Sequence, residues 1–167
     1  MKCEKCGSET SALVRFCPNC GGKIAELQQK KPNEVTTEWL RTLMSRLGYT
    51  PAPNVEDSSD SVFGIHDNRY NLTLSILNNP RAITFRSGFN MKKPKVINEF
   101  LLALNKANLG SVTTTYFVSD TFDGLWVYSF LILTSQIDDL DVMKMIERFD
   151  EEIRHTIKSA GLLALME

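Results

Sequence analysis

All four cysteines of the chain lie within its first twenty residues, as two C-x-x-C pairs. Cys3 and Cys6 form the first pair, and Cys17 and Cys20 form the second. This spacing lets a tight turn point two sulfurs at one metal ion. A segment of about twenty-four residues buries too little surface to fold unaided, whereas structural zinc contributes about 10–16 kcal/mol of apparent binding energy. We therefore expect these cysteines to hold one structural Zn²⁺ ion.

Two other uses of paired cysteines are a disulfide and a thioredoxin-like redox motif. A redox C-x-x-C follows a strand and begins a helix, whereas Cys3 is almost the first residue and Cys20 runs into Gly21 and Gly22. Those glycines, and Gly7 after the first pair, permit positive φ angles and close approach of backbone amides to the sulfurs. A site with four protein ligands leaves no position for substrate, so we expect no catalysis at the metal.

The motifs CEKCG and CPNCG resemble the knuckles of the zinc-ribbon family, and the likeness covers residues 1–24. It implies that Cys3, Cys6, Cys17 and Cys20 are the ligands. The segment 12–16, ALVRF, is predicted to be a short strand that leads into the second knuckle. Zinc ribbons serve in nucleic-acid binding, protein docking and structural capping, so the resemblance implies no single function.

The composition is that of a folded protein with one ordinary domain and a small appendage. The 167 residues are 43% hydrophobic and 23% charged, and the net charge is -1. This charge provides no global attraction to nucleic acid or to an anionic membrane. No stretch of about 18 apolar residues or secretory leader is visible, so we predict a cytoplasmic location and no membrane partner. The polar segment 25–34 is predicted to be a linker that tethers the ribbon loosely to a domain over residues 35–167.

Hydrophobic periodicity within 35–167 predicts an α+β domain in which helices pack an antiparallel sheet. Thr36 or Thr37 caps a first helix that stops at Gly48. Pro94 opens a second helix, whose packed side carries Ile97, Phe100, Leu101 and Leu104. Five strands are predicted near residues 62–65, 70–76, 83–89, 112–119 and 125–134. Asp138 or Asp139 caps a last helix, whose buried stripe is predicted to be Val142, Ile146, Phe149, Ile153 and Ile157. The predicted order of elements is therefore α-β-β-β-α-β-β-α.

The stretch VINEFLLALNKANLGSVTTTYFVSDTFDGLWVYSFLI, Val96 to Ile132, resembles the helix and hairpin of the YbjN family. That family shares the fold of type III secretion chaperones, and the likeness extends over about 36–163. The resemblance to the YbjN family implies a sensory or regulatory role. The fold shared with secretion chaperones implies that the domain binds another protein.

The sequence shows no catalytic machinery. His66 and His155, the two histidines, come with no organised nucleophile, and phosphate-binding glycine motifs are absent. The acidic residues near 138–141 suit a helix N-terminus, while Glu147, Asp150, Glu151 and Glu152 are predicted to lie on a solvated face. We expect a non-enzymatic protein, and nothing indicates a small-molecule substrate.

Two features suggest contacts with other molecules. In the strand 125–134, alternation places Trp126, Tyr128, Phe130 and Ile132 on one face and Leu125, Val127, Leu131 and Leu133 on the other. The chain's own helices can cover one face of this strand. The second face must be covered either by the rest of the chain, including the ribbon, or by a homodimer mate or a client protein. The lysines Lys92, Lys93 and Lys95 precede a helix, where they form either a solvated turn or an anion contact.

The resulting hypothesis is a zinc-binding adaptor or regulator that binds a protein partner or a second copy of itself. The alternative is a nucleic-acid-associated regulator whose ribbon contacts phosphate. A weaker third hypothesis is an enzyme whose site the sequence does not reveal.

Overall fold

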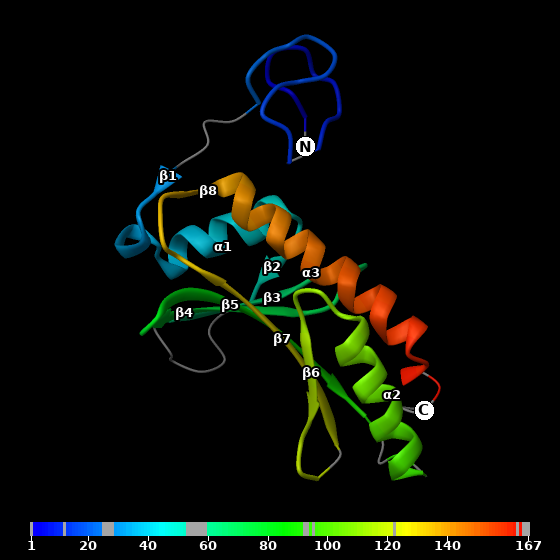
Figure 1. Cartoon of the computed structure of the whole chain (residues 1–167). Coiled ribbons are helices and arrows are strands. Elements are labelled where there is room, and N and C mark those ends of the chain that lie inside the picture. The colour runs from blue at the N-terminus through cyan, green and yellow to red at the C-terminus, as the bar shows by residue number, and fades with distance from the viewer. Residues whose placement is uncertain are drawn as a thin grey trace.

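The computed structural model describes residues 2–11, 13–24, 29–52, 60–91, 94, 96–121, 123–162 and 164. These residues contain three α-helices and a six-stranded antiparallel sheet (Figure 1). The predicted α+β class and the order α-β-β-β-α-β-β-α are confirmed. The three short strands β1, β2 and β8 were not predicted. In the described part of the chain, no helix is long and apolar enough to cross a membrane.

The sheet has the strand order β2-β3-β4-β5-β7-β6, in which β6 is an edge although it precedes β7 in the chain. A separate two-stranded ladder joins β1 to β8. The elements are β1 (Gln29–Lys30), the 3-10 helix η1 (Pro32–Glu34), α1 (Thr37–Arg46), β2 (Thr50–Pro51), β3 (Ser61–Ile65), β4 (Leu72–Asn78), β5 (Arg81–Asn90), α2 (Ile97–Gly110), β6 (Thr115–Val118), β7 (Gly124–Ile132), β8 (Ile137–Asp138) and α3 (Asp139–Ser159).

All three α-helices bury side chains against the same face of the sheet. Leu40 of α1, Phe100 of α2 and Ile146 of α3 are fully buried in one cluster with Phe85 and Val127 of the central strands. The predicted stripe of α3 is confirmed, since each of its five residues is buried. This one-sided packing divides the sheet into a core face and an outer face.

Helix α2 begins later than the sequence predicted. Val96 is its N-cap residue, in an extended conformation, so Pro94 precedes the helix and does not open it. Ile97 and Leu101 are each 37% exposed, which contradicts their assignment to the packed side. The buried stripe is Phe100, Leu104 and Ala107, and the partly buried Ala103 packs against the same core.

Several acidic side chains of α3 connect elements and are not solvated. Asp138 is the N-cap as predicted, and it accepts a hydrogen bond from the Asp141 amide at 3.0 Å. Asp139 is buried and accepts from Trp39 Nε1 at 2.8 Å, which ties α3 to α1. The predicted solvated position of Asp150 is wrong, because Asp150 is 5% exposed and accepts from the backbone amide of Tyr70 at 3.1 Å.

The two edges of the sheet are both restricted. Asn108 of α2 donates to the carbonyl of Tyr116 at 2.9 Å and accepts from its amide at 2.7 Å, so a side chain occupies the outer edge of β6. At the opposite edge, β2 is two residues long and contains Pro51, which has no amide hydrogen.

The second half of the predicted linker is fixed on the domain. Gln29 and Lys30 pair with β8, and the Arg81 guanidinium donates to the carbonyl oxygens of Pro32 and Val35 at 3.0 and 2.9 Å. The prediction of a loose tether is therefore wrong for residues 29–34, because β1 pairs with β8 and Arg81 donates hydrogen bonds to this segment and to Val35. Residues 25–28 lie outside the described ranges, and the predicted domain boundaries 1–24 and 35–167 stay predictions.

Candidate metal centre and exposed sheet face

The two cysteine knuckles have the same backbone geometry. The Gly7 amide donates to the carbonyl of Cys3 at 2.8 Å, and the Gly21 amide donates to the carbonyl of Cys17 at 2.9 Å. Gly7 and Gly21 have φ angles of 72° and 65°, a region that residues with a Cβ rarely adopt. Each C-x-x-C pair is therefore followed by a glycine that its turn requires.

The structure brings the four predicted ligands together. Their sulfur atoms all lie within 4.8 Å of one another, with Cys3 to Cys20 at 3.8 Å and Cys6 to Cys17 at 3.6 Å. A disulfide would require about 2.05 Å between sulfurs. A tetrahedral ion with metal–sulfur bonds of about 2.3 Å would place its sulfurs about 3.8 Å apart. The cluster therefore fits one tetrahedral metal ion and does not fit two disulfides.

Interactions among the sulfurs and nearby donors shift the pKa values of Cys6 and Cys20 in opposite directions. The hydroxyl of Ser8, 3.2 Å from Cys6 Sγ, and then the Ser8 amide lower the pKa of Cys6 to about 6. The Gly22 amide donates to Cys20 Sγ at 3.4 Å and lowers its pKa, but the neighbouring cysteines outweigh it and raise the pKa to about 11. Four thiolates so close together repel one another, and a bound cation removes that repulsion.

The ribbon has little regular structure apart from its knuckles. Isolated bridges pair Lys2 with Glu9 and Phe16 with Lys23. The predicted strand 12–16 is not formed at 13–15, and Ala12 lies outside the described residues. So few residues bury only a small cluster of Cys3, Cys17 and Ile24, with Cys20 packed against it, which is too small to support a sheet.

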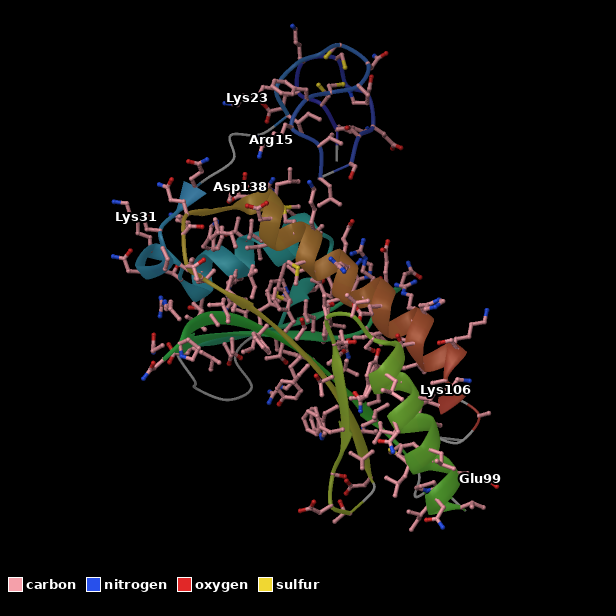
Figure 2. The ribbon with its side chains drawn as sticks, in the orientation of Figure 1. Arg15, Lys23, Lys31, Glu99, Lys106 and Asp138 are labelled. Atoms are coloured by element: carbon pink, nitrogen blue, oxygen red, sulfur yellow. The ribbon has the colours of Figure 1, made fainter. Side chains whose placement is uncertain are left out.

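The ribbon contacts the larger domain at the beginning of α3. Arg15 forms an ion pair with Asp138 at 2.8 Å, and Figure 2 shows the two side chains where the ribbon approaches the helix. The side chain of Asp138 is 9% exposed and that of Arg15 is 57% exposed. Leu13 also packs against the main core. One carboxylate therefore caps α3 and binds the ribbon.

Four large side chains of β7 lie on the outer face of the sheet. Trp126, Phe130 and Ile132 are 36%, 65% and 49% exposed, and Tyr128 is partly buried between them. The alternate residues Leu125, Val127 and Leu133 are buried on the core side. In the parts of the chain that the structure describes, no helix packs on the outer face (Figure 1).

Neighbouring strands extend this surface. The Arg86 guanidinium lies 5.6 Å from the ring centroid of Trp126 and 6.0 Å from that of Tyr128, and the Phe117 ring is 4.9 Å from Tyr128. A Cβ at Gly88 would lie 2.4 Å from the Trp126 ring, so the indole packs directly on the glycine. We call the set Arg86, Phe117, Trp126, Tyr128, Phe130 and Ile132 the aromatic face. The sequence could not add Phe117 and Arg86, because their proximity depends on strand register.

The remaining candidates do not form a site in the described residues. Lys92, Lys93 and Lys95 lie outside those residues, and their anion contact stays a prediction. The Nδ1 atom of His66 accepts from the Asn68 amide at 3.0 Å, and His155 is exposed on α3.

A depression of about 430 Å³ beside His66 is lined by charged side chains that pair with one another. Arg69 binds Glu147 at 3.2 Å, and Arg154 binds Asp150 at 2.7 Å. Burial, reinforced by the charge of Asp150, raises the pKa of the nearby Tyr49 to about 12. These contacts stabilise the packing of β3, β4 and α3.

Comparison with known proteins identifies the domain. Residues 36–158 match the YbjN family, which is described as "Putative bacterial sensory transduction regulator". The chain belongs to the YbjN family. The sequence-based resemblance is therefore confirmed for this region, and the ribbon precedes the residues that match.

One solved structure shows the fold of this YbjN-family chain, and a second is a weaker match. The protein of the "Crystal structure of YbjN, a putative transcription regulator from E. coli" is 18% identical, with a TM-score of 0.59 over 78% of this chain and 94% of that chain. A type III secretion chaperone from Yersinia pestis, SycH in complex with a stable fragment of YscM2, is 11% identical, with a TM-score of 0.43 over 71% of this chain and 97% of that chain. No curated protein matches this chain.

Proposed function

We propose that this YbjN-family protein is a non-enzymatic cytoplasmic regulator that binds a partner protein through its aromatic face and one structural Zn²⁺ ion through its ribbon. The observation that carries the partner proposal is the run of exposed side chains along β7, Trp126, Phe130 and Ile132, opposite a fully packed core face. Single exposed apolar residues are common on protein surfaces, whereas contiguous apolar patches mark interaction sites.

The chemistry of the aromatic face favours a protein over a nucleic acid. Trp, Tyr and Arg dominate the energetics of protein interfaces, and here Arg86 lies over the rings of both Trp126 and Tyr128. Binding of a phosphate backbone requires several cations, whereas the aromatic face has one, Arg86. Exposed rings can also stack with single-stranded bases, so a nucleic acid is the outcome that the experiment must distinguish.

The experiment compares crosslinked pull-downs of the full chain from its native cytosol, with and without nuclease. Wild type is tested beside Phe130→Asp and the control Val112→Ser, which removes an exposed apolar side chain from another surface. We expect one protein to copurify with wild type and Val112→Ser, to resist nuclease and to be lost with Phe130→Asp. Equal recovery with Phe130→Asp, or material that nuclease removes, would contradict the proposal.

The zinc proposal rests on the sulfur distances, which fit a tetrahedral ion. Replacing Cys17 with Ser removes a buried ligand. In metalloproteins generally, substitution of a residue that only hydrogen-bonds to a metal ligand already reduces metal affinity about 10–100-fold. We predict that Cys17→Ser lowers zinc affinity by more than about 100-fold in competition with a chromogenic chelator. Glu4→Gln, an exposed change on the first knuckle, should bind one ion with unchanged affinity. Wild-type affinity in Cys17→Ser would disprove the four-ligand site.

A further inference from the structure

Strand β7 has an open edge over its last residues, because β6 pairs with only part of it. The ladder between β6 and β7 ends at Tyr128, whereas the ladder between β5 and β7 continues to Ile132. A longer β6 would have to include Thr113, but the Thr113 amide donates to the Glu152 carboxylate of α3 at 3.0 Å. Beyond Tyr128, β7 therefore has a described strand on one side only.

The backbone groups along this open edge have no partner among the described residues. In an antiparallel strand, the amide and the carbonyl of one residue point to the same side, and successive residues alternate between the two sides. The Leu133 amide donates to the Arg81 carbonyl at 2.9 Å, so Leu133 and Leu131 face β5. Phe130 and Ile132 therefore direct their amides and carbonyls away from β5, where an added strand would use them.

A groove of about 410 Å³ beside the end of β7 gives room for an added chain. The last residues of β7 and the connection to β8 form one side of the groove, and α3 forms the other. The lining residues of α3 follow the helical period along one side of the helix, and they are Asp141, Lys144, Met145 and Arg148. Leu131 and Met145 are partly buried and contribute apolar surface.

The described lining of this groove has an excess of positive charge. Lys144 and Arg148 are exposed, and neither forms a hydrogen bond or an ion pair with a described residue. Asp141 is the single carboxylate among the described lining residues, and it accepts from the Asp138 amide at 3.3 Å. An acidic ligand is therefore complementary to the groove, because it would meet two cations that have no other described partner.

We propose that the partner protein inserts an extended, acidic segment into this groove and adds it as a strand along the open edge of β7. Its backbone would pair with Phe130 and Ile132, and its side chains would alternate between the groove and the outer face of the sheet. Groove-facing carboxylates would meet Lys144 and Arg148, and outward-facing apolar side chains would extend the aromatic face. This binding mode rests on the proposed partner function, because Phe130 and Ile132 belong to both surfaces.

The charge of the groove favours a partner segment over a second copy of the chain. If two copies paired edge to edge at β7, the lysine and arginine of one copy would approach those of the other, and like charges in contact are unfavourable. The outer edges of the sheet also compete poorly for a strand. Asn108 bonds to both backbone groups of Tyr116 in β6, and β2 contains Pro51.

Peptides selected on the protein provide the probe for the charge of the groove. A displayed library of random eight-residue peptides is selected on the immobilised full chain, and the best binder is synthesised with a fluorescent label. We expect the selected peptides to alternate apolar and acidic residues. In fluorescence anisotropy, K144E/R148E should weaken binding about tenfold or more. K158E, the same charge reversal at another exposed position of α3, should leave binding unchanged.

Two methylated forms of the selected peptide test the backbone pairing. One form carries N-methyl groups at its even positions and the other at its odd positions. A strand that adds to β7 pairs through one alternate set of its amides, so one form should lose binding and the other should retain it. Hydrogen exchange should also show new protection of the Phe130 and Ile132 amides when the unmethylated peptide binds.

Several results would overturn the inference. The selection could yield no binder or a consensus without acidic residues. The selected peptide could bind K144E/R148E as well as wild type, or the two methylated forms could bind equally.

The crosslinked pull-down distinguishes this inference from the proposed function when K144E/R148E is added to it. Loss of the partner protein with both Phe130→Asp and K144E/R148E would support both. A partner that is lost with Phe130→Asp but kept with K144E/R148E would leave the proposed function standing and would exclude the groove as the site. A partner kept with both variants would contradict both.

Discussion

Glu152 shows how one side chain fixes a connection between elements. Its carboxylate accepts hydrogen bonds from the amides of Val112, Thr113 and Thr114, at 2.8, 3.0 and 3.2 Å, and from both threonine hydroxyls. Burial raises the pKa of Glu152, but the hydrogen bonds, those of Thr113 foremost, outweigh it and lower the pKa below its ordinary value. The sequence-based assignment of Glu152 to a solvated face is therefore wrong.

We predict that Glu152→Gln destabilises the fold by about 1 kcal/mol, which is below the roughly 1.5–3 kcal/mol typical of hydrogen bonds to charged groups because the carboxylate is partly exposed. Since the folded pKa is lowered, this contribution is present above the unfolded pKa and is lost as the pH falls through the folded pKa. Chemical denaturation at neutral and acidic pH measures both effects. The neighbouring exposed change Glu151→Gln is the control, and an equal loss in both variants would contradict the assignment.

Gly88 is required by the Trp126 ring that packs on it. A methyl group at this position would lie 2.4 Å from the ring, so Gly88→Ala should displace the indole and weaken its contact with Arg86. We expect a change in intrinsic fluorescence with little change in secondary structure. Gly110→Ala, where an added Cβ meets nothing within 4 Å, should leave the fluorescence unchanged. An unshifted spectrum in Gly88→Ala would contradict this packing.

At the scale of elements, β8 and the first turn of α3 form a junction between three parts of the chain. Asp138 pairs with Gln29 of β1, caps α3 and binds Arg15 of the ribbon. A different carboxylate oxygen of Asp138 serves the cap and the ion pair. Oδ1 accepts a hydrogen bond from the Asp141 amide, and Oδ2 binds Arg15. The position of the ribbon and the stability of the helix terminus are therefore linked through one side chain.

Two substitutions at this position should separate its roles. Asp138→Ala removes the cap and should cost about 1 kcal/mol, whereas Asp138→Asn retains capping ability and loses the charge that binds Arg15. We expect faster hydrogen exchange in the ribbon for both variants, and a lower melting temperature mainly for Asp138→Ala. Arg15→Gln should reproduce the effect of Asp138→Asn. Unchanged ribbon exchange in all three variants would show that this ion pair does not hold the ribbon.

The elements that the sequence predicted best are those with a strong local signal. The α3 stripe, Val142 to Ile157, follows the helical period over four turns, and Asp138 has the side chain of an N-cap. The clustering of the cysteines likewise depends on short spacings and on two glycines. By contrast, the bond from Trp39 to Asp139 joins residues 100 positions apart. No local pattern encodes such a contact, so the burial of acidic residues on α3 could not be predicted.

At the scale of the whole molecule, the ribbon and the domain have separate cores. The ribbon cluster contains Cys3, Cys17 and Ile24, and the large cluster contains residues of all three α-helices and the sheet. The described contacts between the two parts include the Arg15–Asp138 ion pair and the packing of Leu13. Among the described residues, the Arg15–Asp138 ion pair and the packing of Leu13 therefore couple the stability of one part to that of the other.

We predict that a strong chelator unfolds residues 2–24 and leaves the domain folded. Without the metal, four close thiols and a cluster of three buried residues cannot order the ribbon. Hydrogen exchange should show loss of protection at the Gly7 and Gly21 amides while the strands β4, β5 and β7 stay protected. Chelator with a saturating excess of zinc is the control. Simultaneous loss of protection in the central strands would show that the ribbon is part of the domain core.

The blocked edges of the sheet have a consequence for how copies of this protein behave at high concentration. Asn108 occupies the hydrogen-bonding groups of Tyr116 that an incoming strand would use, and Pro51 lacks the donor that a strand would need at the other edge. At these two described positions, the sheet therefore disfavours the strand-by-strand growth that begins amyloid fibres. The large aromatic side chains of the flat outer face therefore lie between two edges at which described residues hinder the addition of a strand.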